Sequence, residues 1–194
     1  MKKSSSTTLP LNAVIPTQKT RKYKEIRITQ TSEVINVSAV TLWQIVSDFE
    51  NVGQWTSTLK RSTGAGKPEF EGASVSERVC HTNIKGYDHI HEKLTMYNEA
   101  NKELAYKVTK GLPRFVLLAS NHWTVHEVGA NQSIIKMEAT TRLTRFMGFL
   151  FGSRMKKTAL KALKTVLEEL KVYAETGEVA EAKKVQMRKL RKSA

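Results

Sequence analysis

Glu92 is the residue whose side chain and sequence surroundings point most directly to a chemical role. It lies in the run 87–96, in which one alternate set of side chains is the more apolar and is expected to face the interior of a sheet. A carboxyl group against apolar walls can anchor a ligand hydroxyl group or transfer protons as a general acid or base. It can equally be a structural group, hydrogen-bonded to Asn121 or to an arginine such as Arg78. The sequence leaves both roles open.

Metal and nucleophile chemistry are not indicated by the histidines and the cysteine. His89 and His91 are two residues apart and His122 and His126 are four apart, so each pair shares one face of a strand that turns toward solvent. A zinc site would need a third ligand, and no matching cysteine or acid cluster is evident. Cys80 is the only cysteine, and the sequence provides neither a helix N-terminus nor an obvious histidine partner that would activate it. We therefore expect no metal ion and no cofactor.

The positive charge is concentrated at the two ends of the chain. The 194 residues carry 32 Lys and Arg against 18 Asp and Glu, a net charge of +14. Residues 1–25 contain six basic residues and one acid, and residues 178–194 contain six basic residues and two acids. The body of the chain is therefore only mildly basic, and contact with RNA, the ribosome or an anionic membrane is expected, if at all, as a weak contact through the ends.

We expect three segments: a disordered basic N-terminal tail over 1–25, one domain over 26–177 and a basic C-terminal tail over 178–194. The first is rich in Ser, Thr, Lys and Pro and has little to bury. The last is interpreted as a solvated, frayed extension or, alternatively, as a basic amphipathic helix. No apolar run is long enough to span a membrane, and no apolar segment follows Lys2 and Lys3 as in a secretory signal, so a cytoplasmic protein is expected.

Three segments between these ends have helical spacing. Apolar residues over 39–46 follow Ser38, a good N-cap, and a second short helical turn covers 50–55. A long amphipathic helix is predicted from about Phe149 to Thr176, where Gly177 would end it.

Strand-like alternation fills the rest of the domain, with turn residues between the runs. The predicted strands are 23–37, 73–81, 87–97, 103–109, 115–128 and 133–143. The glycine-rich run 62–68 is interpreted as a turn, because its glycine spacing does not fit a phosphate-binding loop. The order predicts an α+β fold: a curved antiparallel sheet of about seven strands wrapped around the long C-terminal helix, with two short helices after the first strand.

Several motifs in this order resemble the START/polyketide-cyclase (SRPBCC) superfamily, whose fold is the helix-grip. They are the run 37–55 with its two tryptophans and Asp-Phe, Gly72 before a strand with Arg78, Glu92-Lys93-Leu94, Trp123-Thr124-Val125, and the helix end 170–177. The resemblance covers residues 26–177. It implies a cavity between sheet and long helix, which the family uses for lipids, sterols, polyketides, quinones and hormones.

The expected lining of that cavity combines the more apolar strand faces with one face of the long helix. The residues are Trp55, Ile90, Glu92, Leu94, Tyr106, Ala119, Asn121, Trp123, Ile135, Met137, Ala139, Met155, Ala159, Leu163 and Val166. The alternation also turns Asp88 and Met96 inward.

Three classes of function are consistent with this sequence. The first is a binding or carrier protein for a small hydrophobic ligand such as a lipid, quinone or polyketide-like molecule. The second is a cyclase, aromatase or dehydratase-like enzyme, with Glu92 as catalytic residue and Asp88 or Tyr106 assisting proton transfer. The third is a ribosome- or RNA-associated module that acts through the basic ends. We favour the carrier, because only an apolar cavity follows from the fold.

Overall fold

A computed structural model describes residues 22–82 and 86–192 of the chain. Most of the expected N-terminal tail, residues 1–21, lies outside the described residues. Its last residues, 23–25, belong to the first strand.

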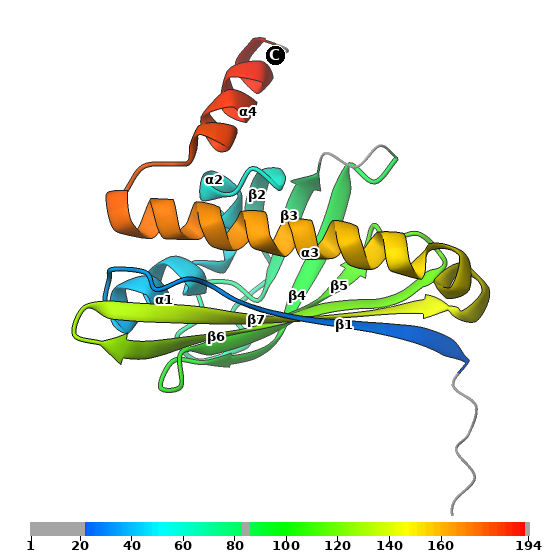
Figure 1. Cartoon of the computed structure of the whole chain (residues 1–194), viewed down its shortest axis with the longest axis horizontal. Helices are drawn as coiled ribbons and strands as arrows, with labels where there is room; N and C mark the ends of the chain where they lie inside the picture. Colours follow the sequence, from blue (N-terminus) through cyan, green and yellow to red (C-terminus); the bar gives the residue numbers. More distant parts are fainter. Residues whose placement is uncertain (1–21, 83–85, 193–194) are drawn as a thin grey trace, which may run out of the picture.

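Seven antiparallel strands form one curved sheet in the order β1-β7-β6-β5-β4-β3-β2 (Figure 1). The strands are β1 (Tyr23–Thr31), β2 (Leu59–Ala65), β3 (Glu77–Thr82), β4 (His89–Asn98), β5 (Glu103–Lys110), β6 (Val116–Gly129) and β7 (Gln132–Thr144). Sequential strands pair from β2 to β7, and β1 pairs with β7. The predicted antiparallel meander and α+β class are confirmed.

The two largest errors in the strand predictions concern the first strand and β2. The first strand ends at Thr31, and the chain beyond it keeps only a single bridge, between Ile35 and Ser133. The run 62–68, interpreted as a turn, begins inside β2. This strand is at the edge of the sheet and has no clear alternation of buried and exposed residues, so the apolar pattern could not reveal it.

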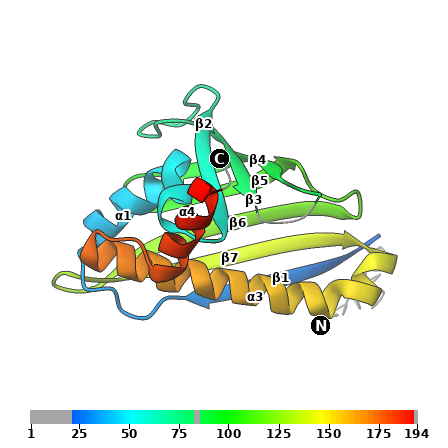
Figure 2. The same cartoon turned by 90° about the horizontal axis from the view of Figure 1, so that it is seen from above.

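The long helix α3 (Arg145–Thr176) runs along one face of the sheet, and the C-terminal helix α4 (Glu181–Lys192) projects from its end (Figures 1 and 2). The other helices are α1 (Ala39–Ser47), the 3₁₀ turn η1 (Phe49–Asn51) and α2 (Val52–Trp55). Ser38 caps α1, accepting a hydrogen bond from the Thr41 backbone N–H at 3.1 Å. Gly177 ends α3 in the left-handed conformation, with φ of +72°. Within the described ranges, no helix combines the length and apolar character needed to cross a bilayer.

The C-terminal segment is a helix that is fastened to the domain. Lys183 of α4 is buried, and its Nζ donates hydrogen bonds to the carbonyl oxygens of Leu59 at 2.8 Å and Lys60 at 3.2 Å. Gln186 Nε2 donates a further bond to the Ser57 carbonyl oxygen at 2.8 Å. The interpretation of this segment as a frayed extension was therefore wrong for residues 181–192; the alternative, a basic helix, describes it.

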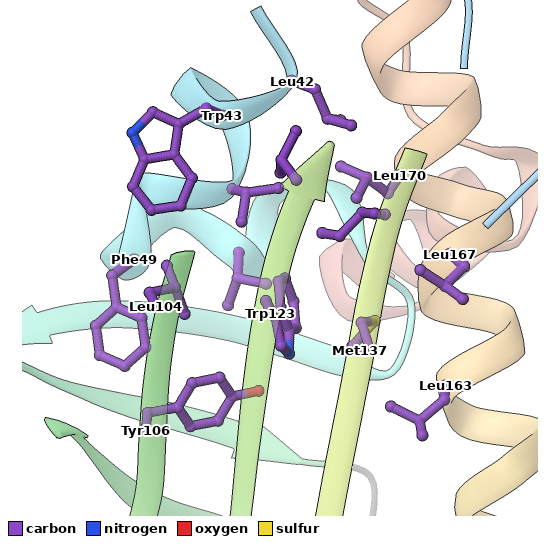
Figure 3. Packing of buried hydrophobic residues seen from close by; sticks show 14 of the residues in the cluster. Leu42, Trp43, Phe49, Leu104, Tyr106, Trp123, Met137, Leu163, Leu167 and Leu170 are labelled. Atoms are coloured by element: carbon purple, nitrogen blue, oxygen red, sulfur yellow. The ribbon is translucent and has the colours of Figure 1, made fainter. Parts of the chain in front are cut away.

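The core lies between the sheet, α1 and the C-terminal half of α3. Figure 3 shows Leu163, Leu167 and Leu170 of α3 directed toward β6 and β7, where Trp123 and Met137 meet them. Leu42 and Trp43 of α1 close the same cluster at one end (Figure 3). This packing holds the long helix at a fixed distance from the sheet and sets the space that remains between them.

Candidate functional site

A cavity of about 160 Å³ lies between the sheet and α3. Its lining comes from the α2–β2 segment, β3 to β7 and α3: Val52, Thr56, Thr58, Leu59, Arg78, Glu92, Tyr106, Asn121, Trp123, Met137, Ala162, Leu163 and Val166. Seven residues expected in the lining lie here: Glu92, Tyr106, Asn121, Trp123, Met137, Leu163 and Val166.

The other expected lining residues lie elsewhere. Trp55, Leu94 and Ile135 are buried in the solid core, while Ile90 and Ala119 are partly exposed. Ala139, with Arg27 and Glu138, lines a neighbouring depression that shares Tyr106 and Asn121 with the cavity. Met155 and Ala159 line a groove along the N-terminal half of α3, because this helix begins at Arg145 and extends beyond the cavity.

Asp88 and Met96, which the alternation of apolar residues predicted to face the interior, do not do so in the structure. Asp88 is exposed, because β4 begins only at His89. Met96 follows a register shift between Leu94 and Met96, which interrupts the alternation. Tyr97 takes the inward place instead and packs against Trp43 with ring centroids 5.4 Å apart.

Glu92 forms a buried ion pair at the cavity. It lies opposite Arg78 in the β3–β4 ladder, and Arg78 Nε donates to Glu92 Oε2 at 2.6 Å. The same guanidinium donates from Nη1 to the Phe49 carbonyl oxygen at 2.8 Å. It also lies over the rings of Phe49 and Tyr106, 4.0 and 4.7 Å from their centroids. Cys80 Sγ donates to Glu92 Oε2 at 3.4 Å. Of the two partners proposed for Glu92, Arg78 is the one that the structure provides.

Burial and charge set the protonation of the groups around this pair. Burial raises the pKa of the Cys80 thiol to about 12 and also raises the pKa of Tyr106. Burial alone would lower the pKa of Arg78, but the charge of Glu92 opposes this and the net shift is upward. At neutral pH the cavity therefore presents a neutral phenol and a cationic guanidinium, and the thiol beside it is un-ionised.

Two buried polar atoms in the lining have no hydrogen-bond partner among the described residues. They are Asn121 Oδ1, an acceptor, and Trp123 Nε1, a donor. Both side chains come from β6, two residues apart, and Trp123 packs edge-on against Tyr106 (Figure 3). An unpaired buried polar atom is costly, so the two atoms mark a place where a ligand's polar group would be stabilised.

The α2–β2 segment closes one side of the cavity and is held from two helices. Glu169 of α3 accepts hydrogen bonds at Oε2 from Thr56 Oγ1 at 2.9 Å and from the Ser57 backbone N–H at 2.7 Å. Lys183 of α4 donates to the carbonyl oxygens of Leu59 and Lys60, and burial lowers its pKa to about 8. Val52 belongs to the predicted helical turn over 50–55 but was not expected in the lining, and residues 56–59 were assigned to no element, so Thr56, Thr58 and Leu59 were missed as well.

The histidines do not converge on a metal site. His89 is exposed beside His81, and His122 lies 3.3 Å from Glu103 and 3.7 Å from Glu138. Over residues 22–82 and 86–192, no three His, Cys, Asp or Glu side chains are grouped so that they could hold a metal ion.

The chain was compared with known proteins by sequence and by structure. Residues 26–175 match the family model described as polyketide cyclase / dehydrase and lipid transport. No curated protein is similar enough in sequence to match.

Solved structures with low sequence identity share the fold. A START superfamily protein from Mycobacterium smegmatis has a TM-score of 0.64 at 18% identity, covering 78% of this chain and 99% of its own. The Zhui aromatase/cyclase from Streptomyces sp. R1128 has a TM-score of 0.58 at 11% identity, covering 81% and 100%. A norcoclaurine synthase from Thalictrum flavum has a TM-score of 0.60 at 12% identity, covering 79% and 98%.

Proposed function

Because the chain belongs to the polyketide cyclase / dehydrase and lipid transport family, we propose that it binds a small hydrophobic ligand in the cavity between the sheet and α3 and carries it unchanged. The observation that carries this proposal is the lining of the cavity. Its walls are mainly apolar side chains such as Met137, Leu163 and Val166, and two unpaired polar atoms belong to lining residues of β6. Ligand pockets in proteins have this composition.

The size of the cavity limits the ligand. An apolar cavity of about 150 Å³ accommodates a benzene ring, and the volume here is about 160 Å³. The proposed ligand, or the part of it that enters, is therefore a single substituted ring or a short chain. A quinone-like or phenolic head fits this volume better than a complete two-chain lipid.

The polar atoms limit its chemistry. Asn121 Oδ1 needs a donor and Trp123 Nε1 needs an acceptor, and one hydroxyl group supplies both. We therefore propose a ligand with an apolar body and one hydroxyl group directed toward β6. A carbonyl group would satisfy Trp123 alone and should bind more weakly.

The enzyme alternative receives less support from the lining. Glu92 is the one carboxylate among the described lining residues, and its Oε2 is already shared by Arg78 and Cys80. A cyclase or dehydratase would need an acid and a base that converge on the substrate. The aromatase/cyclase and the synthase named above share the fold at 11% and 12% identity, which does not transfer their chemistry to this chain.

Native mass spectrometry of the protein purified from its own host tests the proposal. We expect a reproducible bound molecule, which extraction should identify as small, largely apolar and hydroxylated. A protein that is empty and converts an aromatic polyketide would contradict the carrier function and support the enzyme. No function through RNA or ribosome binding is proposed, because no contact described here supports one.

A further inference from the structure

The N-terminal part of α3 exposes large apolar side chains to solvent. Phe146 is 71% exposed, Phe149 83% and Leu150 52%. These three residues are spaced i, i+3, i+4 and therefore share one face of the helix. Phe151, 45% exposed, lies beside them and lines an apolar groove of about 550 Å³. We call these four residues the α3 apolar face. Folded proteins seldom expose such a cluster unless it has an interaction partner.

Two glycines explain why the phenylalanines cannot turn inward. Gly148 and Gly152 are buried on the opposite side of α3, four residues apart. A Cβ atom at Gly148 would lie 2.5 Å from the Lys24 Cβ atom, so the helix backbone is pressed against β1. Because no side chain fits between helix and strand here, the bulky residues must point away from the sheet. The exposure of the α3 apolar face is thus built into the packing.

The same stretch of helix is strongly and uniformly basic. From Arg145 to Leu167 the sequence contains six Lys and Arg residues and no acid. All six are exposed: Arg145, Arg154, Lys156, Lys157, Lys161 and Lys164. Only Lys164 is paired with an acid in the described part of the chain, with Glu168 at 3.6 Å. The potential around the α3 apolar face is therefore positive.

We propose that the N-terminal half of α3 docks on an anionic lipid surface. The phenylalanines of the α3 apolar face would enter the boundary between headgroups and acyl chains, and the flanking lysines and arginines would contact lipid phosphates. Aromatic residues on one face and basic residues beside them are the composition of helices that lie in a membrane interface. The helix lies along the surface and does not cross the bilayer.

Other occupants match this surface less well. A second copy related by a two-fold axis would bring the same six positive charges face to face. The chain's own residues 1–21 carry four basic residues and no acid, so they offer no complementary charge either. A nucleic acid would satisfy the cations but would leave the phenylalanines in water. An anionic membrane satisfies both requirements at once.

The proposed docking surface adjoins the ligand cavity. Ala162 lines both the cavity and the apolar groove beside Phe151. A ligand taken from the bilayer would thus have a short path past α3 into the cavity. The docking proposal itself rests on exposure and charge alone, so it stands or fails independently of the ligand.

Vesicle flotation with the full chain tests docking. The probes are vesicles of phosphatidylcholine alone and vesicles of phosphatidylcholine mixed with an equal amount of phosphatidylglycerol. We expect binding to the anionic vesicles to weaken as salt is raised, and little binding to phosphatidylcholine. The double variant F146S/F149S should lose at least about tenfold in affinity, because two phenyl groups no longer leave water. Circular dichroism should show that it remains folded.

Matched variants separate this surface from the rest of the chain. V40S removes an exposed apolar residue of α1, 56% exposed, and should bind as the wild type does. K156E/K157E should weaken binding to anionic vesicles clearly more than R191E/K192E, which alters the C-terminal helix by the same charge. Equal binding by F146S/F149S and wild type, or a larger loss in R191E/K192E, would overturn the proposal. So would a wild-type dimer that F146S/F149S abolishes, or RNA binding that depends on the same phenylalanines.

Discussion

Arg78 and Glu92 face each other across β3 and β4 with 2.6 Å between Nε and Oε2, and both side chains are almost completely buried. The pair forms part of the cavity wall. Glu92, a candidate catalytic residue from the sequence, is thus the counter-ion of Arg78. Two charges taken out of water are tolerated only while each compensates the other.

Glu92→Gln should therefore destabilise the protein, because Arg78 would keep its charge without a counter-ion. We expect a loss of about 3–5 kcal/mol in the free energy of unfolding, measured by urea denaturation. The double variant Arg78→Met/Glu92→Leu should recover most of the loss. Full stability of Glu92→Gln together with loss of a catalysed reaction would identify Glu92 as a catalytic residue instead.

Cys80 should be unreactive in the folded protein. Burial raises its pKa to about 12, so at pH 8 it holds about a thousandfold less thiolate than an ordinary cysteine. Alkylation by iodoacetamide should proceed only as fast as the protein opens and should become rapid in urea. Rapid labelling under native conditions would show that the region around the ion pair opens readily.

Asn121→Leu should leave the protein folded and should weaken binding of a phenolic probe by about tenfold relative to its deoxy analogue, since the acceptor for the hydroxyl group is removed. Trp123→Phe removes the donor and should reduce the same preference. Isothermal titration with the two probes measures it. An unchanged preference in both variants would mean that the ligand's polar group binds elsewhere.

The docking of α4 should depend on pH. Burial lowers the pKa of Lys183 to about 8, so between that pH and its ordinary range the unfolded chain binds more protons than the folded one. Stability should therefore rise with pH through this window. Lys183→Met should lack the rise, and the two proteins should be compared by urea denaturation at pH 7.5 and 9.5. Parallel changes in both would assign the pH dependence to other groups.

The fold could be predicted to the extent that apolar periodicity recorded it. The apolar face of the long helix predicted that helix, because such a face must pack against a sheet. Gly177 predicted its C-terminal end, because glycine tolerates the left-handed conformation of the cap. β2 was missed since an edge strand packed beside η1 and α2 needs no regular apolar face. α4 was misjudged because it is held by Lys183, a residue type that sequence patterns assign to solvent.

The site was predictable where alternation is unbroken. Glu92, Asn121, Trp123 and Met137 follow from alternation within their strands, and all line the cavity. The register shift after Leu94 is a local backbone feature with no sequence signature, so Met96 was placed on the wrong face. The N-terminal part of α3 packs against β1 at Gly148 and extends beyond the cavity, which the sequence does not reveal. Met155 and Ala159, which were expected in the lining, therefore lie in the outer groove.

The central claim, a ligand cavity between the sheet and α3, is tested most directly by the affinity of an environment-sensitive apolar fluorophore for Val166→Trp and Ala159→Trp. Val166 lines the cavity, and Ala159 lies on the same helix but lines the outer groove. The account predicts that Val166→Trp binds the fluorophore at least about tenfold more weakly, since the indole fills the cavity, while Ala159→Trp retains binding and both remain folded. Wild-type affinity in Val166→Trp together with loss in Ala159→Trp would contradict it.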